Sequence, residues 1–238
     1  MKVVVNPTWR CQLRCPYCWM HGLGFKPGSE MPARMWLWFL RQLPGPLTVD
    51  FSGGEPLLYD GLFTIIEGLI AFPAGWAMTS NLVNKEAVDA LIAKRYGNCM
   101  GIQVSAHKGG PADLYERAAA LAEAGYPVAL NVVAHAGARA VPDGMRVNMI
   151  PYQAWTEGEA VDGIARQCDA GREHLVMSPD GYVYRCAVEM QLDAPPLGRI
   201  SNAWTDIQPV EPHECRIGCS TCYTDNPRSW RVAMEAIE

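Results

Sequence analysis

The chain has 238 residues, of which 49% are hydrophobic and 19% are charged. This composition excludes a wholly disordered chain, because disorder requires lower hydrophobicity and a larger net charge, and it supplies enough apolar side chains for one sizeable core. Twenty Lys and Arg against 25 Asp and Glu give a formal net charge of -5. A large binding surface for a nucleic-acid backbone is therefore not expected.

Neither a transmembrane helix nor a signal peptide is expected. The longest apolar run, Leu62 to Phe72, contains Glu67, whereas a spanning helix needs about 20 apolar residues. The apolar run near the N-terminus, Val3 to Val5, is too short for a signal peptide. We therefore predict a cytoplasmic protein that makes no contact with membranes.

Strand-like and helical segments alternate through the first 150 residues. The predicted strands are 3–5, 47–51, 76–78, 102–105, 128–133 and 147–150, and the predicted helices are 32–43, 57–72, 85–94 and 112–124. Repeated strand–helix–strand units imply parallel strands with right-handed crossovers. The mostly continuous apolar runs predict strands that are covered on both faces. The connection 134–144 is too short for a comfortable crossover helix, so we expect the fifth helix to be lost or reduced.

The pattern changes after Pro151. We predict a helix over 157–167, a β-hairpin that turns at Asp180-Gly181, and a short helix over 229–237. The remaining loop-rich sequence lacks a hydrophobic core of its own, so it needs a metal site or cross-link to hold it together, which its cysteines can supply. The sequence thus predicts two domains, an α/β domain over 1–150 and a small hairpin and loop extension over 151–238.

Eight of the nine cysteines fall into two groups, which in a reducing compartment indicates metal or redox chemistry. Cys11, Cys15 and Cys18 follow the first predicted strand. Thiolates favour zinc and iron–sulfur clusters, and structural zinc sites and electron-carrying clusters are normally closed by four protein ligands. Three local cysteines leave one metal position open for a substrate, unless a distant fourth ligand completes a zinc site. The isolated Cys99 is expected to be buried and inert.

The spacing C-x3-C-x2-C directly after the first strand resembles that of the radical S-adenosylmethionine (SAM) superfamily, and Tyr17 matches the aromatic residue that usually precedes the third cysteine. The resemblance implies a partial (β/α)6 barrel and a [4Fe-4S] cluster on the three cysteines, with the amino and carboxylate groups of SAM on the open iron. Gly53-Gly54-Glu55-Pro56 resembles the family's GGEP motif, which contacts the SAM amino group. Two glycines permit a close approach of the backbone to a ligand, and Glu55 suits an ammonium.

Further residues match family positions at the ends of later strands. The resemblance implies that such polar residues hold the SAM carboxylate and ribose, and that an apolar residue on the last strand lies beside the adenine. In this chain the polar residues are Ser80, Asn81, Ser105 and Asn131, and the apolar one is Ile150. Ligands of parallel α/β sheets bind at these strand ends, although each residue alone also fits a strand-end cap or a core position.

The second group of cysteines lies in the C-terminal extension. Cys168 and Cys186 flank the predicted hairpin, with Gly181 between them, which resembles the C-x9–15-G-x4-C signature of the twitch and SPASM extensions of radical SAM enzymes. The resemblance implies one auxiliary [4Fe-4S] cluster. We favour Cys168, Cys186, Cys219 and Cys222 as its ligands, with Cys215 as an alternative ligand. A four-cysteine zinc ribbon is the other interpretation of this group.

The resemblance implies an enzyme that reductively cleaves SAM to a 5′-deoxyadenosyl radical. That radical would abstract hydrogen from an unactivated C–H bond, and the auxiliary cluster would assist oxidation or relay electrons. No residue stands out as a catalytic acid or base. The first strand begins at residue 2, so we expect no N-terminal peptide-binding domain. This favours a small-molecule substrate, or a peptide brought by a separate delivery protein, and a reductase or flavodoxin-type protein as electron donor.

Two other classes of function stay open. Modification of a nucleoside or base in DNA or RNA is a second radical SAM chemistry, which the acidic charge balance disfavours. A zinc-stapled binding module and a ferredoxin-like electron carrier are the non-enzymatic alternatives. A carrier would need protein ligands for every iron, whereas the first group offers only three cysteines.

Overall fold

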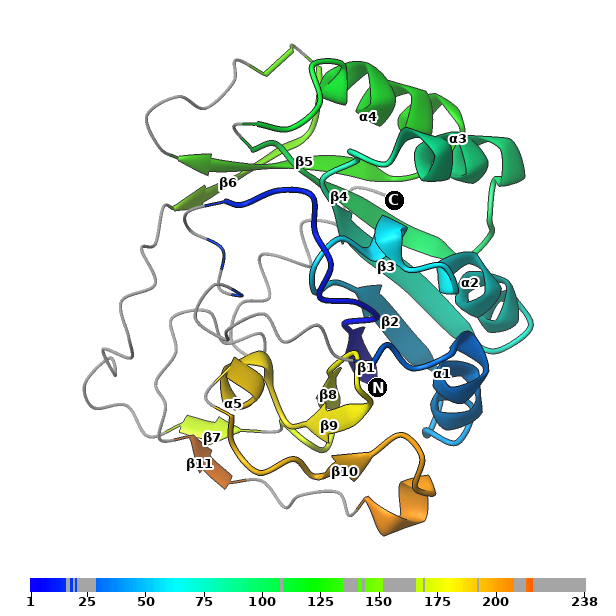
Figure 1. The fold of residues 1–238 in the computed structure, drawn as a ribbon, viewed down its shortest axis with the longest axis vertical. Helices are drawn as coiled ribbons and strands as arrows, with labels where there is room; N and C mark the ends of the chain where they lie inside the picture. Colours follow the sequence, from blue (N-terminus) through cyan, green and yellow to red (C-terminus); the bar gives the residue numbers. More distant parts are fainter. Residues whose placement is uncertain are drawn as a thin grey trace.

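The computed structural model describes residues 1–15, 18, 20, 29–107, 109–134, 141–142, 144–151, 166–168, 170–191, 193–207 and 213–215. Six strands that follow one another in the sequence lie side by side in parallel (Figure 1). They are β1 (Lys2–Val5), β2 (Leu47–Phe51), β3 (Ala74–Ser80), β4 (Cys99–Ser105), β5 (Val128–Ala134) and β6 (Val147–Pro151). The sheet is open at β6, which confirms the prediction of an α/β fold built on a partial barrel.

Helices connect the first five strands close to the predicted positions. They are α1 (Ala33–Leu40), α2 (Leu62–Ile70), α3 (Lys85–Lys94) and α4 (Leu114–Glu123). The predicted helix over 57–72 is divided into a 3-10 turn, η2 (Pro56–Leu58), and α2, because Glu55 caps the turn by accepting a hydrogen bond from the Leu57 backbone N–H. Gly125 ends α4 with a φ of 97°, the left-handed conformation that glycine adopts without strain.

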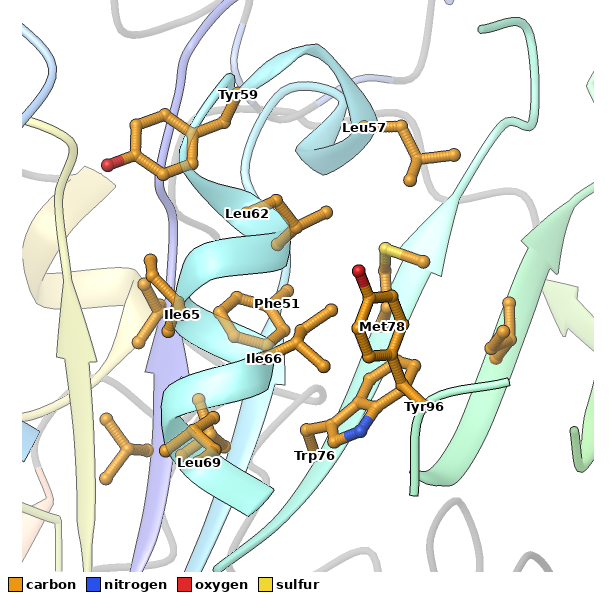
Figure 2. Packing of buried hydrophobic residues seen from close by; sticks show 14 of the residues in the cluster. Phe51, Leu57, Tyr59, Leu62, Ile65, Ile66, Leu69, Trp76, Met78 and Tyr96 are labelled. Carbon is orange, nitrogen blue, oxygen red and sulfur yellow. The ribbon is translucent and has the colours of Figure 1, made fainter. Parts of the chain in front are cut away.

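The four helices cover one face of the sheet, which we call the outer face. Ile65, Ile66 and Leu69 of α2 lie over Phe51 of β2 and the neighbouring strand β3 (Figure 2). All four side chains are 0–1% exposed. Burying such side chains removes apolar surface from water at roughly 25 cal/mol per Å², so this face holds the hydrophobic core that fixes the strands in place.

The opposite, inner face of the sheet carries polar residues beside a small apolar cluster around Val4. On β4 the exposed fraction alternates, with Ile102 and Val104 at 0–1% and Gln103 and Ser105 only partly buried. Successive side chains of a strand point to opposite faces, so Gln103 and Ser105 lie on the inner face. The inner face is covered as well, as predicted, since Val4, Asp50 and Ala77 on this face are 2–7% exposed. Single polar residues inside the apolar runs mark the inner face.

The C-terminal segment adds to the same sheet. Strands β8 (His174–Met177) and β9 (Tyr182–Tyr184) form an antiparallel pair across the turn at Gly181, which has a φ of 84°. The predicted hairpin is thus confirmed. Strand β8 also pairs in parallel with β1, and β10 (Gly198–Arg199) pairs with β9, which gives a sheet of nine strands. The division into two domains at residue 150 stays a prediction.

Several shorter elements complete the described chain. They are α5 (Ala187–Gln191), η3 (Trp204–Asp206) and a separate antiparallel pair of β7 (Arg166–Cys168) with β11 (His213–Cys215). The helix predicted over 157–167 was wrong at residues 166 and 167, which belong to β7, and the rest of it lies outside the described residues. So do the helix predicted over 229–237 and most of the connection 134–144. Within the described residues, no helix has the length and apolarity needed to cross a membrane.

Candidate active site

The first group of cysteines lies just beyond the end of β1. Cys11, Cys15 and Cys18 are partly buried, and the backbone N–H of Cys18 donates to the carbonyl of Cys15 over 3.0 Å, which turns the loop. Burial raises the pKa of the Cys11 thiol. Tyr17, whose match to the family supported this motif, lies outside the described residues.

The three sulfurs do not form a site for a single metal ion. Among the described residues, no three His, Cys, Asp or Glu side chains come together closely enough to hold one ion. One zinc ion would need its thiolates roughly 4 Å apart, since the Zn–S bond is about 2.3 Å long. In an iron–sulfur cluster each cysteine binds a different iron, so the thiolates stand farther apart.

A network of hydrogen bonds holds the entry to the cysteine loop. The Arg10 guanidinium donates from Nε and Nη2 to the two carboxylate oxygens of Glu30, over 2.7 and 2.9 Å, and from Nη2 to the carbonyl of Leu58 over 2.6 Å. The Thr8 hydroxyl donates to the same carboxylate and accepts from the Arg10 backbone N–H. A two-point contact between Arg and a carboxylate fixes orientation as well as distance. These contacts therefore hold the backbone conformation at Arg10, directly before Cys11.

The two glycines of the GGEP segment pack against that entry. The N–H groups of Gly54 and Glu55 donate to the carbonyls of Thr8 and Arg10, over 2.9 and 2.7 Å. A Cβ on Gly54 would lie 2.2 Å from the Arg10 carbonyl oxygen, and Gly53 has a φ of +101°. Both positions therefore require glycine because of the chain's own backbone. Contact of these glycines and Pro56 with SAM stays a prediction.

Glu55 connects this segment to the end of β3. Its side chain is 1% exposed, and its carboxylate accepts hydrogen bonds from the Ser80 hydroxyl at 2.7 Å and from the Asn81 and Leu57 backbone N–H groups at 2.7 and 3.1 Å. Burial raises the pKa of this carboxyl to about 7, although the three donors oppose the shift. The predicted contact of Glu55 with the SAM ammonium is a separate role from this one, and it stays a prediction.

Asn81 joins the strand end to the cysteine loop. Its Nδ2 donates to the Cys11 sulfur over 3.6 Å, while its Oδ1 accepts from the Val83 backbone N–H over 2.9 Å. The sequence singled out Ser80 and Asn81 only as polar residues at a strand end. Their contacts with Glu55 and Cys11 form where the ends of two strands meet, and the spacing of residues in the sequence does not predict such contacts.

The remaining predicted SAM contacts lie on the strands near the open edge of the sheet. Ser105 of β4 is paired in register with Asn131 of β5, and Ile150 lies on β6 beside Val133. Asn131 is 8% exposed and belongs to a chain of amide side chains that sequence reasoning missed. Asn148 Nδ2 donates to Asn131 Oδ1 at 3.1 Å, and Asn131 Nδ2 donates to Gln103 Oε1 at 2.9 Å.

The second group of cysteines is only partly described. Cys186 precedes α5 and accepts a hydrogen bond at its sulfur from the Glu189 backbone N–H, over 3.5 Å. Cys168 and Cys215 lie on the paired strands β7 and β11, where Cys168 is opposite His213 and Cys215 is opposite Arg166. Cys219 and Cys222 lie outside the described residues.

Helix α5 brings Cys186 to the side of the sheet on which the first cysteine loop begins. Met190 of α5 packs with Val4 of β1 and with Trp9, and Asn6 Nδ2 donates to the sulfur of Met190 over 3.7 Å. Figure 1 shows α5 on the side of the sheet away from α1 to α4. The isolated Cys99 lies in β4 and is partly buried, and burial raises the pKa of its thiol to about 12; its predicted lack of reactivity stays a prediction.

Comparison with known proteins gives both sequence and structural relatives. No family model matches the chain. A probable GTP 3′,8-cyclase from Methanopyrus kandleri is 40% identical over 74 residues, which are 30% of this chain and 24% of that protein. The chain therefore spans about a quarter of this curated relative.

Solved structures match over most of the chain. SuiB from Streptococcus suis superposes with a TM-score of 0.64 and 16% identity over 89% of this chain and 66% of its own, and SuiB structures with SAM or with its precursor peptide SuiA give TM-scores of 0.65 and 0.67. The structure of anSMEcpe with bound SAM and a peptide gives a TM-score of 0.59 at 13% identity, over 87% of this chain and 79% of its own. The chain spans just under two thirds of SuiB, and at these identities the likeness establishes the fold.

Proposed function

We propose that this chain is a radical SAM enzyme, which reductively cleaves SAM and abstracts a hydrogen atom from a C–H bond of its substrate; its fold and its sequence likeness over 74 residues support this. The observation that carries this proposal is the loop of three thiols at the end of β1, tied to the GGEP segment and to Asn81 at the neighbouring strand ends.

The residues of this loop fit a [4Fe-4S] cluster. Cys11, Cys15 and Cys18 would each hold one iron, and no described His, Cys, Asp or Glu joins them to make a closed single-metal site. A cluster bound there supplies the electron that cleaves SAM into methionine and a 5′-deoxyadenosyl radical. The chain's own contribution is rigidity, since Arg10 and Glu30 hold the entry to the loop and Asn81 donates to the Cys11 sulfur.

We propose that SAM lies along the carboxyl ends of β2 to β6. The GGEP segment would face its amino group, and Ser80, Asn81, Ser105 and Asn131 would hold its carboxylate and ribose. Ile150 would lie beside its adenine. Support comes from the placement of these residues at one end of a parallel sheet, which is where ligands bind in such folds.

For the C-terminal segment we propose an auxiliary [4Fe-4S] cluster that accepts or relays an electron during turnover. Cys186 and Cys168 would provide two ligands, with the others drawn from Cys215, Cys219 and Cys222. The packing of α5 against the start of the first cysteine loop supports a location near the substrate.

The proposed substrate is a small molecule or a peptide, and the proposed electron donor is a reductase or flavodoxin-type protein. SuiB and anSMEcpe have been solved with peptides bound, which supports a peptide as the substrate here. The likeness to a probable GTP 3′,8-cyclase over 74 residues supports a small molecule. A base in DNA or RNA is the less favoured substrate, because the net charge of -5 provides no general attraction for phosphates.

Replacement of one cluster ligand tests the proposed function. Cys15→Ala should lose about four of the roughly eight irons that two [4Fe-4S] clusters contain, and should form no 5′-deoxyadenosine when the anaerobically reconstituted protein is reduced in the presence of SAM. Cys99→Ala is the control, because Cys99 is a separate thiol in β4. Wild-type protein that carries two zinc ions and no iron, or Cys15→Ala protein that still cleaves SAM, would contradict the proposal.

A further inference from the structure

Asn6 lies between β1 and the first cysteine loop and is an amide that the proposed chemistry does not use. It is 1% exposed. Its backbone N–H and its Nδ2 both donate to the carbonyl of Met177, at the end of β8, over 3.0 and 2.9 Å. Its Nδ2 also donates to the sulfur of Met190 in α5 over 3.7 Å. Asn6 therefore attaches the entry to the cysteine loop to two elements of the C-terminal segment.

The same residue is in contact with the GGEP segment. A Cβ on Gly53 would lie 2.9 Å from the Cβ of Asn6 and 3.2 Å from its Cα, so the backbone of Gly53 packs directly on Asn6. The N–H of Ser52 donates to the carbonyl of Val5 over 3.0 Å, which ties the start of the segment to the residue before Asn6. A displacement of Asn6 would therefore disturb both the loop entry and the segment that we place beside SAM.

The residues that follow the cysteine loop are attached to the C-terminal segment as well. The N–H of Met31 donates to the carbonyl of Pro179, in the hairpin turn, over 2.8 Å, and its carbonyl accepts from the Tyr59 hydroxyl over 2.6 Å. A Cβ on Gly181, in the same turn, would lie 3.0 Å from the Cγ of Met31. The first cysteine loop is thus held by the C-terminal segment both before and after its three cysteines.

Helix α5 connects these contacts to a cysteine of the second group. Cys186 directly precedes the helix. Its sulfur accepts from the Glu189 N–H over 3.5 Å, and its carbonyl accepts from the Met190 N–H over 3.2 Å. Met190 is 5% exposed and belongs to a small buried cluster with Val4 of β1, against which Trp9 of the loop entry packs. Met190 therefore contacts the entry to the first loop from a helix that begins at Cys186.

Contacts of this kind make the two groups of cysteines depend on each other. A metal bound at Cys186 would fix the start of α5 and thereby the position of Met190. Close-packed interiors transmit such a restraint to neighbouring side chains, and Met190 in turn limits the movement of Asn6. Binding that favours one arrangement of the chain also favours any other site that needs this arrangement, and the effect is reciprocal.

We propose that Asn6 and Met190 are positioning residues that couple the two cysteine sites, so that a cluster bound at Cys186 stabilises the cluster held by Cys11, Cys15 and Cys18. This inference rests on the proposed function, because it adds a form of regulation to the same two cluster sites. A chain that lacks the second cluster then holds the first one less tightly.

The test measures how fast the first cluster loses iron. The anaerobically reconstituted full chain is exposed to an iron chelator, and the remaining first cluster is followed by its electron paramagnetic resonance signal, which SAM perturbs. Loss should be at least about fivefold faster in Cys186→Ala protein than in the wild type, the lower end of typical coupling between two sites. In Met190→Ala or Asn6→Ala protein, adding Cys186→Ala should change the rate less than about twofold, because contacting residues on one route are not additive.

Met78→Ala provides the matched control. Met78 in β3 is also a buried methionine, 0% exposed, but it belongs to the main core beside α2 (Figure 2). Its removal should also destabilise the fold, because it leaves a cavity. In this background, however, Cys186→Ala should still accelerate the loss of iron at least about fivefold. The comparison separates coupling between the two sites from a general loss of stability.

Hydrogen exchange gives a second measurement, which does not require Cys186→Ala protein to fold. In the protein with both clusters loaded, Met190→Ala should accelerate amide exchange in a peptide covering residues 6–15 at least about fivefold more than in peptides from β4. Met78→Ala should produce no such difference, since a general loss of stability accelerates all slowly exchanging amides together.

Three results would overturn the inference. They are equal rates of iron loss in wild-type and Cys186→Ala protein, an acceleration by Cys186→Ala that persists in the Met190→Ala and Asn6→Ala proteins, and exchange in Met190→Ala protein that rises equally in residues 6–15 and in β4. Cys186→Ala protein with the iron content of the wild type would contradict the auxiliary cluster and this inference together. SAM cleavage is measured separately, by 5′-deoxyadenosine. Wild-type protein that cleaves SAM, with a first cluster indifferent to Cys186, would overturn only this inference.

Discussion

Individual side chains at the strand ends act mainly on one another. Glu55 accepts three hydrogen bonds, two of them from Ser80 and Asn81, and Asn81 in turn donates to the Cys11 sulfur. One buried carboxylate thereby fixes the residue that contacts a cysteine of the candidate cluster site. Because low surrounding dielectric strengthens such connected hydrogen bonds, the position of Cys11 depends on β3 as well as on its own loop.

The contact between Asn81 and Cys11 leads to a prediction about reduction potential. Hydrogen bonds to cluster sulfurs are among the features that set the potential of an iron–sulfur cluster, and donors near the sulfur favour the more negative, reduced state. Asn81→Leu should therefore lower the potential of the first cluster by tens of millivolts, measured by redox titration followed by electron paramagnetic resonance without SAM.

Ser105→Ala serves as the comparison for this measurement. Ser105 is another predicted SAM contact, but it lies on β4, where it is paired in register with Asn131 of β5. In the Ser105→Ala protein, the reduction potential of the first cluster without SAM should equal that of the wild type. Equal potentials in all three proteins would show that the Asn81 contact has no effect on the cluster.

At the level of single residues, the sequence offers clear motifs where the chemistry is local. The three cysteines and the GGEP segment are recognisable because each is a short run with a distinctive spacing. The amide chain of Gln103, Asn131 and Asn148 was not recognisable, because it crosses three strands and depends on their register. Asn131 alone was selected, for its position along a strand.

At the scale of elements, the helices are held by the face that they bury. In α2, Ile66 is fully buried over the sheet, whereas Ile70, one turn later, is 40% exposed. The two residues have the same side chain in the same helix. They therefore separate the effect of burial from that of helix propensity.

Ile66→Ala should lower the free energy of unfolding by roughly 2–5 kcal/mol, the range for removing a buried isoleucine side chain from a core. Ile70→Ala should change it by at most about 1 kcal/mol, since the exposed side chain leaves no cavity. Chemical denaturation followed by circular dichroism measures both values. Similar losses in the two variants would show that α2 does not pack as Figure 2 shows.

Element boundaries were predictable where local signals mark them, as at Gly125 after α4 and at Asp180-Gly181 in the hairpin. Some polar residues of the inner face, such as Asp50 in β2, were not singled out because each strand contributes only one or two of them within an otherwise apolar run. A period of two is hard to recognise in strands of only five residues.

At the scale of the whole molecule, the hydrophobic core does not stop at residue 150. Leu175, Val183, Ile200 and Ile207 belong to the same buried cluster as the residues of β1 and β2. Trp204 packs edge-on against Phe39 of α1 at 6.2 Å between ring centroids. The sequence could not predict this continuity, because the pairing of β8 with β1 joins segments about 170 residues apart.

This shared core predicts that the two halves of the chain unfold together. Ile200 is 0% exposed, so Ile200→Ala should destabilise the protein by roughly 2–5 kcal/mol. The loss should accelerate amide hydrogen exchange in peptides from β1 and β2 as much as in peptides from β8 and β9, because the slowest amides exchange through global unfolding. Mass spectrometry of exchanged peptides measures this, with the exposed neighbour Ser201→Ala as control. Faster exchange confined to residues 174–207 would show instead that the C-terminal segment opens as a unit of its own, as the division into domains 1–150 and 151–238 implies.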